Sequence, residues 1–231
     1  MRYDHVKKAV FRLRPNRFVA ECELEGKKVA AHVRNTGRCR ELLVPGCTVY
    51  LEENLRPDRK TQHTLVSVEK SGRTINVDSL APNKAFREAM EEGYIGLPGF
   101  DGPCTLLKPE ARYAESRFDF YMESGSQKAF VEVKGVTLEE DGVVLFPDAP
   151  TERGVKHIHG LCRAAESGYL AFLIFVVQMK AVRYLTPNRR THPAFGEAME
   201  AARKAGVSLL AFDCRVAPDE IRLDEPIKIV L

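Results

Sequence analysis

The sequence predicts a protein of two domains, a small N-terminal β-barrel followed by a larger α/β domain. Short segments rich in β-branched and aromatic residues recur about every ten residues in the first part of the chain, and turn residues divide them. The later part combines such segments with a stretch of helical character, as expected for an α/β domain. With 231 residues, the chain is long enough to bury a core in each domain.

The N-terminal prediction depends on six segments with the composition and alternation of short strands. They are residues 8–13, 17–24, 28–33, 48–51, 63–68 and 73–77. Five or six short strands in about eighty residues favour a small barrel of the oligonucleotide-binding type, the OB-fold. We place the boundary near residues 79–83, so that the barrel covers 1–82 and the second domain 83–231. Residues 84–92 then have helical periodicity, and Gly93 suits a helix C-cap.

Two strands in the second domain carry the main functional prediction. Residues 116–121 and 129–134 alternate around β-branched and aromatic side chains, and residues 123–126 between them suit a hairpin loop. Side chains two positions apart on a strand share a face, so Glu132 and Lys134 project together, and normal pairing brings Asp119 opposite them. Carboxylates and an ammonium gathered on one face are costly, and a divalent cation such as Mg²⁺ would compensate that cost.

Asp119, Glu132 and Lys134 follow the PD-(D/E)xK pattern of restriction-endonuclease-like nucleases. In those nucleases the carboxylates hold Mg²⁺, and the lysine lies beside the attacking water and the scissile phosphate. The spacing alone is a weak signal, because an exposed strand with an ion pair two positions apart has the same pattern. The pattern therefore supports a nuclease only if the following elements also match the core of such enzymes.

Those following elements match the α/β core of such nucleases. Residues 143–146 form a third apolar segment, a helix is expected from Thr151 to about residue 167, and the apolar run 169–177 predicts a strand buried on both faces. Thr151 suits the helix N-cap. Arg153, Lys156 and His157 then lie three and four apart on one face of the helix, either as a solvated basic stripe or as contacts to a phosphate backbone beside the metal.

Charge and cysteine usage limit the class of protein. Residues 1–85 contain 17 Lys and Arg against 10 Asp and Glu, whereas the remainder contains 18 against 22. This asymmetry fits a basic part that grips a polyanion and an acidic part that holds metal, although a basic surface also serves solubility. Six scattered cysteines without a C-x-x-C pair argue against structural zinc and suggest reduced thiols. No membrane-spanning run or signal peptide is recognisable, so we expect a cytoplasmic protein without a membrane partner.

Two loops of the barrel suit contacts to phosphates. One contains Asn35 and Arg38, and the other contains Arg59 and Lys60. Each could equally be an ordinary polar turn. Phe18 and Tyr50 are aromatic side chains that could stack on bases, but we expect both in the barrel core.

Several of these segments together resemble a known family. Residues 32–38, 59–61, 116–120, 131–134 and 146–157 resemble, in order, the signature blocks of the sugar fermentation stimulation protein A (SfsA) family. The resemblance covers nearly the whole chain. It implies a bacterial or archaeal cytoplasmic protein with an OB-fold domain, a nuclease-like domain, non-specific DNA binding and a link to sugar (maltose) utilisation. It also implies a metal site at Asp119 and Glu132, with Glu110 as a further acid. His192 departs from the family, which usually has an acid before that proline.

Two functions are consistent with these observations. The first is a Mg²⁺- or Mn²⁺-dependent nuclease that hydrolyses DNA phosphodiesters at Asp119, Glu132 and Lys134. The alternative is a non-catalytic DNA-binding regulator of sugar (maltose) metabolism on a nuclease-like scaffold. The cost of keeping two carboxylates together favours catalysis modestly. The sequence leaves the strandedness of the substrate open, and its apolar end, residues 227–231, could complete a sheet or pair in a homo-oligomer.

Overall fold

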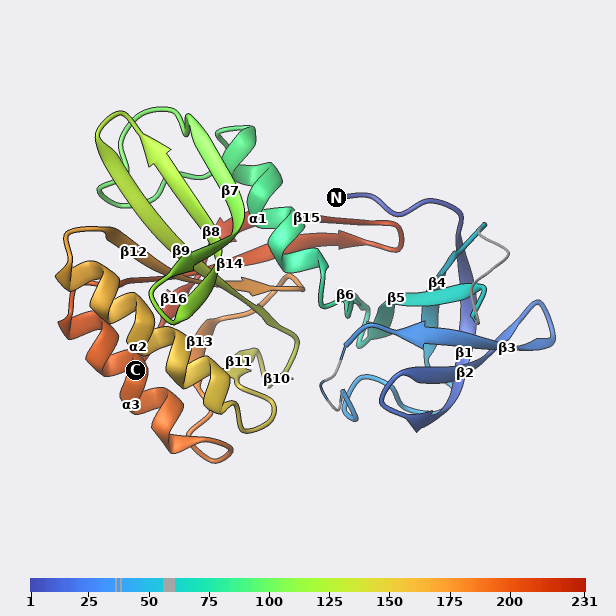
Figure 1. The fold of residues 1–231 in the computed structure, drawn as a ribbon. Helices are drawn as coiled ribbons and strands as arrows, with labels where there is room; N and C mark the ends of the chain where they lie inside the picture. The colour runs from blue at the N-terminus through green and yellow to red at the C-terminus, as the bar shows by residue number, and fades with distance from the viewer. Residues whose placement is uncertain (36, 38, 56–60) are drawn as a thin grey trace.

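The N-terminal domain is a closed five-stranded barrel. The computed structural model describes residues 1–35, 37, 39–55 and 61–231, and Figure 1 shows the two domains beside each other. The barrel strands are β1 (Val6–Asn16), β2 (Val19–Leu24), β3 (Lys27–Val33), β4 (Thr48–Glu53) and β5 (His63–Lys70). They pair in the order β3-β2-β1-β4-β5, and a parallel pairing of β3 with β5 closes the barrel. The predicted OB-fold is confirmed.

Residue alternation explains why these segments fold as barrel strands. In β2, Ala20, Cys22 and Leu24 are buried, whereas the residues between them are half-buried. This period of two places one row of side chains inside the barrel and the other outside. A sixth strand, β6 (Arg73–Asn76), pairs with β5 outside the closed ring and leads to the second domain.

The second domain is built on a mixed six-stranded sheet with the strand order β15-β14-β12-β9-β8-β7. Its strands are β7 (Leu106–Tyr113), β8 (Ser116–Ser124), β9 (Gln127–Val136), β12 (Leu170–Val177), β14 (Ser208–Ala217) and β15 (Glu220–Pro226). Strand β12 is parallel to both of its neighbours, β9 and β14. It lies in the middle of the sheet and is buried almost throughout, as its apolar sequence predicts.

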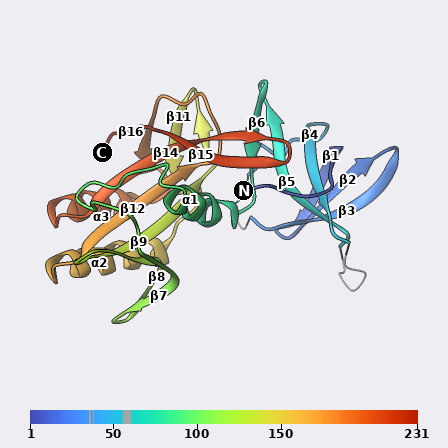
Figure 2. The same cartoon turned by 90° about the horizontal axis from the view of Figure 1, so that it is seen from above.

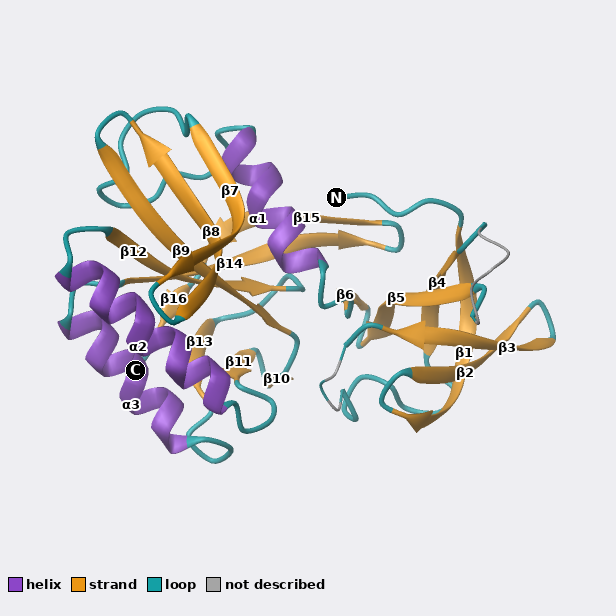
Figure 3. Ribbon diagram, viewed as in Figure 1, coloured by secondary structure: helices purple, strands orange, loops and turns teal. Residues whose placement is uncertain are grey.

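Three helices cover the sheet on both faces. Helix α1 (Ala81–Glu91) packs on one face, and α2 (Glu152–Glu166) and α3 (Pro193–Lys204) pack together on the other (Figures 2 and 3). Thr151 caps α2 by accepting a hydrogen bond from the Gly154 amide at 3.1 Å, as expected. Gly93 follows α1 with φ of +65°, which fits its expected role at the helix end.

Several elements of this domain were not anticipated from the sequence. They are β7, β10 (Glu139–Glu140), β13 (Tyr184–Pro187), α3, β14 and β15. Strand β13 belongs to a second, four-stranded sheet with β10, β11 (Val143–Phe146) and β16 (Lys228–Ile229). The apolar end of the chain therefore completes a sheet within the molecule, because β16 pairs in parallel with β13.

The connection between the domains is a buried polar contact. Asp78, between β6 and α1, is fully buried and accepts a hydrogen bond from Arg34 Nη1 of the barrel at 2.5 Å. Ser79 Oγ donates to the Arg34 carbonyl at 2.7 Å, and Gln178 Nε2, at the end of β12, donates to the Asp78 carbonyl at 3.1 Å. These bonds hold the barrel loop that follows Arg34 against the second domain. No helix in the described part of the chain is long and apolar enough to cross a membrane.

Candidate functional site

The site begins where strands β8 and β9 stop pairing. Their antiparallel register runs from Ser124↔Gln127 to Phe120↔Val131 and ends there. Immediately beyond it, Asp119 Oδ2 accepts the Val133 amide at 2.8 Å, so a side chain takes the place of a strand carbonyl. Asp119 is thereby fixed against the β9 backbone.

A second contact fixes the other oxygen of the Asp119 carboxylate. Asn83 Nδ2, from the first turns of α1, donates to Asp119 Oδ1 at 2.9 Å. Burial and the nearby charge of Glu132 nevertheless raise the pKa of the Asp119 carboxyl. Ionised Asp119 is therefore held in position but is not neutralised by its surroundings.

Glu132 lies on the face of β9 that packs against α2. Its Oε1 atom contacts both the Lys134 ammonium and Nδ1 of His157 from α2, whereas its Oε2 atom is buried and has no hydrogen-bond partner among the described residues. Burial acts to raise the pKa of Glu132, but His157 and Lys134 outweigh it and the pKa is lowered. Glu132 is thus an ionised acid with one bare oxygen.

These two carboxylates fit a divalent cation. Mg²⁺, Mn²⁺ and Ca²⁺ prefer oxygen ligands, and an unpartnered buried carboxylate oxygen is costly unless something binds it. Asp119 and Glu132 are the residues that would hold the ion. Lys134 contacts Glu132, and the charges of both act on Asp119. The structure thus brings together the three residues of the predicted catalytic pattern.

Sequence reasoning missed Asn83. It placed His157 in a basic stripe with Arg153 and Lys156, whereas the structure buries His157 beside Glu132. The buried positions of α2 include Gly154, His157, Leu161 and Ala164, at spacings of three and four. A histidine on the buried face of a helix predicted to follow the catalytic strand was the available signal. Asn83 had no comparable signal, because its role depends on where α1 packs.

Of the other predicted residues of the second domain, Arg153 lies beside the two carboxylates and Glu110 does not. Glu110 is 60% exposed and pairs with Arg117 at 2.6 Å, and it makes no contact with Asp119 or Glu132. Arg153 Nε lies 3.4 Å from His157 Nε2, so the basic side of α2 starts beside the carboxylates.

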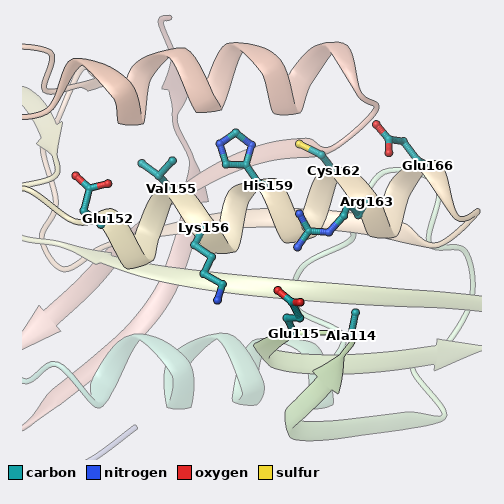
Figure 4. A pocket seen from close by; sticks show the side chains of 9 residues that line it. All are labelled: Ala114, Glu115, Glu152, Val155, Lys156, His159, Cys162, Arg163 and Glu166. Atoms are coloured by element: carbon teal, nitrogen blue, oxygen red, sulfur yellow. The ribbon is translucent and has the colours of Figure 1, made fainter.

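Lys156 lies on the neighbouring part of α2. It is exposed and lines a hollow of about 790 Å³ between α2 and the β7–β8 turn, where Figure 4 shows Lys156 and Arg163 directed toward Glu115. Neither cation is in an ion pair within the described part of the chain. Because Glu115, Glu152 and Glu166 also line the hollow, its charge is balanced rather than strongly basic.

The barrel loop at Asn35 lies close to the segment before α2. The Asn35 side chain accepts the Gly37 amide at 2.7 Å, and a Cβ atom on Gly37 would overlap the carboxylate of Asp148, in the segment before α2. The loop and the start of α2 are therefore neighbours. Arg38, Arg59 and Lys60 lie outside the described residues.

Tyr50 and Phe18 differ from the expectation that both lie in the core. Phe18, in the turn between β1 and β2, is 45% exposed, and Tyr50 is half-buried with its hydroxyl donating to Glu69. The error for Phe18 arose because a turn residue next to a strand can point away from the barrel while its neighbours point inward.

A second acidic cluster in the domain is already neutralised. The carboxylates of Asp213, Asp224 and Glu225 lie together, and Lys180 Nζ reaches Asp213 at 2.9 Å and Asp224 at 2.5 Å. Arg215 adds a bond to Asp224 at 2.8 Å. An ammonium thus occupies the centre of this cluster, which makes it a structural ion network.

Comparison with known proteins identifies relatives over the full length of the chain. Two domain families match it, the SfsA N-terminal OB domain over residues 13–77 and the sugar fermentation stimulation protein RE domain over residues 80–220. Sugar fermentation stimulation protein homologs from Desulfitobacterium hafniense and Ruminiclostridium cellulolyticum are 50% and 49% identical over 231 residues, and each match covers at least 99% of both proteins. A solved structure of Pyrococcus furiosus SfsA in complex with Ca²⁺ is also similar, with a TM-score of 0.89 and 28% identity. That match covers 100% of this chain and 98% of the archaeal one.

Proposed function

The chain belongs to the sugar fermentation stimulation protein (SfsA) family, and on this basis we propose that it is a divalent-metal-dependent nuclease acting on DNA without sequence specificity. One observation carries the proposal: the buried Oε2 of Glu132 has no hydrogen-bond partner among the described residues, on a carboxylate that contacts Lys134 and whose charge raises the pKa of Asp119. A DNA-binding scaffold gains nothing from such a group, because acids without a cation repel phosphates.

The residues of the chain have separate tasks in this reaction. Asn83 and the Val133 amide hold Asp119, and His157 holds Glu132, so both carboxylates are oriented before any ligand arrives. A bound divalent cation supplies Lewis-acid stabilisation of the charge on the phosphate oxygens.

Lys134 has the remaining role at the reacting phosphate. The Lys134 ammonium has three N–H donors, so besides its contact with Glu132 it would donate to a phosphate oxygen or to the attacking water. The ammonium is half-buried beside Glu132, so few water molecules compete for these donors.

The related archaeal structure supports a cation in this family. The Pyrococcus furiosus protein is described as a complex with Ca²⁺, which takes the same hard oxygen ligands as Mg²⁺. We propose Mg²⁺ or Mn²⁺ as the cofactor here, held by Asp119 and Glu132. Glu110 lies outside this set as long as it stays paired with Arg117.

DNA would be held mainly through its phosphates. We propose that Arg153 and Lys156 on α2, together with the barrel loops, contact the backbone on either side of the site. The barrel residues concerned are Asn35, Arg38, Arg59 and Lys60. Contacts of this kind carry little sequence information, which explains the proposed lack of specificity. We propose that the protein acts on DNA in the cytoplasm.

A cleavage assay with labelled DNA tests the proposal. Wild type is expected to cut with Mg²⁺ or Mn²⁺ and not with EDTA, and Asp119→Ala is expected to lose cleavage while keeping or gaining DNA affinity. Asp4→Ala, which removes an exposed acid outside the site, is the matched control and should behave as wild type. Binding without cleavage in both metals would instead favour a non-catalytic DNA-binding regulator.

A further inference from the structure

The barrel contains a basic pocket that the proposed nuclease site does not use. It lies beside the β1–β2 turn, has a volume of about 280 Å³, and is lined by residues of β1, the turn and the segment before β4. The described residues that line it include Arg14, Arg17 and Arg40 and no acid. A hollow lined by three guanidinium groups suits an anion such as a phosphate.

The three arginines have different roles. Arg14 is structural, because it donates to the carbonyls of Gly37, Arg17 and Asn35 at 2.6–2.9 Å and thus fixes the shape of the pocket. Arg40 is exposed and makes no ion pair or hydrogen bond within the described residues through its guanidinium. Arg17 likewise has no acidic partner there, and its guanidinium lies over the ring of Phe18, 4.8 Å from the centroid. Arg17 and Arg40 therefore have unused donors at the pocket.

Phe18 adds an exposed aromatic ring beside these donors. The turn that presents it is firmly built, since Asn16 Oδ1 accepts the amides of Phe18 and Val19 at 2.9 and 3.1 Å. A turn of this construction needs no aromatic residue for its own stability. An exposed ring over which an arginine is already stacked offers a platform for a nucleobase.

We infer that this pocket and Phe18 form a subsite for single-stranded nucleic acid, in which Arg17 and Arg40 bind phosphates and a base stacks on Phe18. The inference rests on the proposed function and narrows its substrate class. Stacking on a side chain requires an unpaired base, which a duplex does not offer without melting. Gly37 lines the pocket and adjoins Asp148 before α2, so a strand bound here could continue toward Asp119 and Glu132. The preferred substrate is thus a single strand or a duplex with a single-stranded extension.

Fluorescence anisotropy with labelled oligothymidylate and a duplex of equal length, both in EDTA, tests this inference. Phe18→Leu is expected to weaken binding of the single strand about fivefold or more, since one stacked base contributes about 1–3 kcal/mol, and to change duplex binding less than about twofold. Arg40→Gln should lower the slope of log K against log salt for the single strand by about 0.7, the value for one phosphate contact.

The chain supplies a matched control for the aromatic substitution. Tyr94 is 46% exposed and has the Arg222 guanidinium 5.1 Å from its ring centroid, but it lies in the second domain, away from the pocket. Tyr94→Leu should leave the affinity for the single strand unchanged. Equal weakening by Phe18→Leu and Tyr94→Leu, or no weakening by Phe18→Leu and an unchanged salt slope in Arg40→Gln, would overturn the inference.

Binding in EDTA keeps this test separate from the test of catalysis. A protein that cuts DNA but binds single strands independently of Phe18 refutes the subsite alone. A protein that binds single strands through Phe18 but never cuts refutes the nuclease and leaves the subsite intact.

Discussion

Two clusters of acids around a lysine occur in the same domain, and they are built in opposite ways. In one, Lys180 reaches Asp213, Asp224 and Glu225, and Arg215 also bonds Asp224. Although burial opposes ionisation, these donors lower the pKa of Asp224 to about 2.

In the other cluster, Lys134 and His157 share a single oxygen of Glu132, and the second oxygen has no hydrogen-bond partner in the described part of the chain. The pKa of Asp119 is raised by burial and by Glu132. The comparison shows that the number of acids does not distinguish a metal site from a structural ion network. What distinguishes them is whether the protein itself already supplies enough positive charge and enough donors for every oxygen.

The largest expected effect concerns cleavage. Glu132→Gln should lower the rate of DNA cleavage in Mn²⁺ by about 10²–10³-fold or more, because it removes the charge that we propose holds the cation. Asp224→Asn, the matched change in the other cluster, should keep the rate within about threefold of wild type. Initial rates at saturating DNA measure both. Comparable losses of cleavage in the two variants would mean that Glu132 is no more important for cleavage than Asp224.

For stability, in contrast to cleavage, a change in the Lys180 cluster should have a larger effect than a change in the Lys134 cluster. Lys180→Met leaves the buried acids short of a cation and should cost about 2 kcal/mol, below the full range for a buried pair because Lys180 is one-third exposed. Thermal unfolding should then begin about 4–8 °C lower. Lys134→Met should cost less than half as much, since His157 still bonds Glu132. A larger loss in Lys134→Met would assign Lys134 a structural role instead of the proposed catalytic one.

The comparison also shows what the sequence could predict. Period-two alternation predicted the barrel strands and β9, and residue order along that one strand placed Glu132 and Lys134 on a common face. The sequence could not predict that Lys180 compensates the charges of Asp213 and Asp224. These residues meet only after a crossover and a hairpin bring three segments together. For the same reason Asn83 escaped prediction, and His157 was assigned to a basic stripe rather than to Glu132.

Some whole elements also carried weak local signals. Strand β7 contains Pro109 and is mostly exposed, as an edge strand can be. Its position is set by pairing with β8, and local sequence does not show that pairing. Phe18 was misplaced in the core because exposure of a turn residue depends on which way the turn faces.

The smallest effect tests the raised pKa of Asp119 directly. Because the folded-state pKa lies above that of the unfolded chain, ionised Asp119 lowers stability at any pH above the folded value, and the cost vanishes below the unfolded value. Asp119→Asn should therefore stabilise the metal-free protein at pH 7 by about 1 kcal/mol, or about 2–4 °C in Tm. Asn83 can turn its amide so that its oxygen accepts from the new side chain, which keeps the geometry.

The pH and metal dependence of this gain distinguish it from a general packing effect. The gain should shrink as the pH falls from the raised pKa of Asp119 toward its ordinary value, where both states become protonated. In Mn²⁺ the wild type should instead be more stable than Asp119→Asn, because a ligand stabilises only the protein that binds it, and the wild type retains both carboxylates.

The parallel change Asp224→Asn should lower Tm without metal, because the pKa of Asp224 is depressed and its ionised form stabilises the fold. A scan of Tm from pH 4 to 8 in EDTA and in Mn²⁺ measures all three. A destabilised Asp119→Asn at neutral pH without metal would mean that the Asp119 carboxylate, like that of Asp224, is already compensated by the protein and that the two clusters are of one kind.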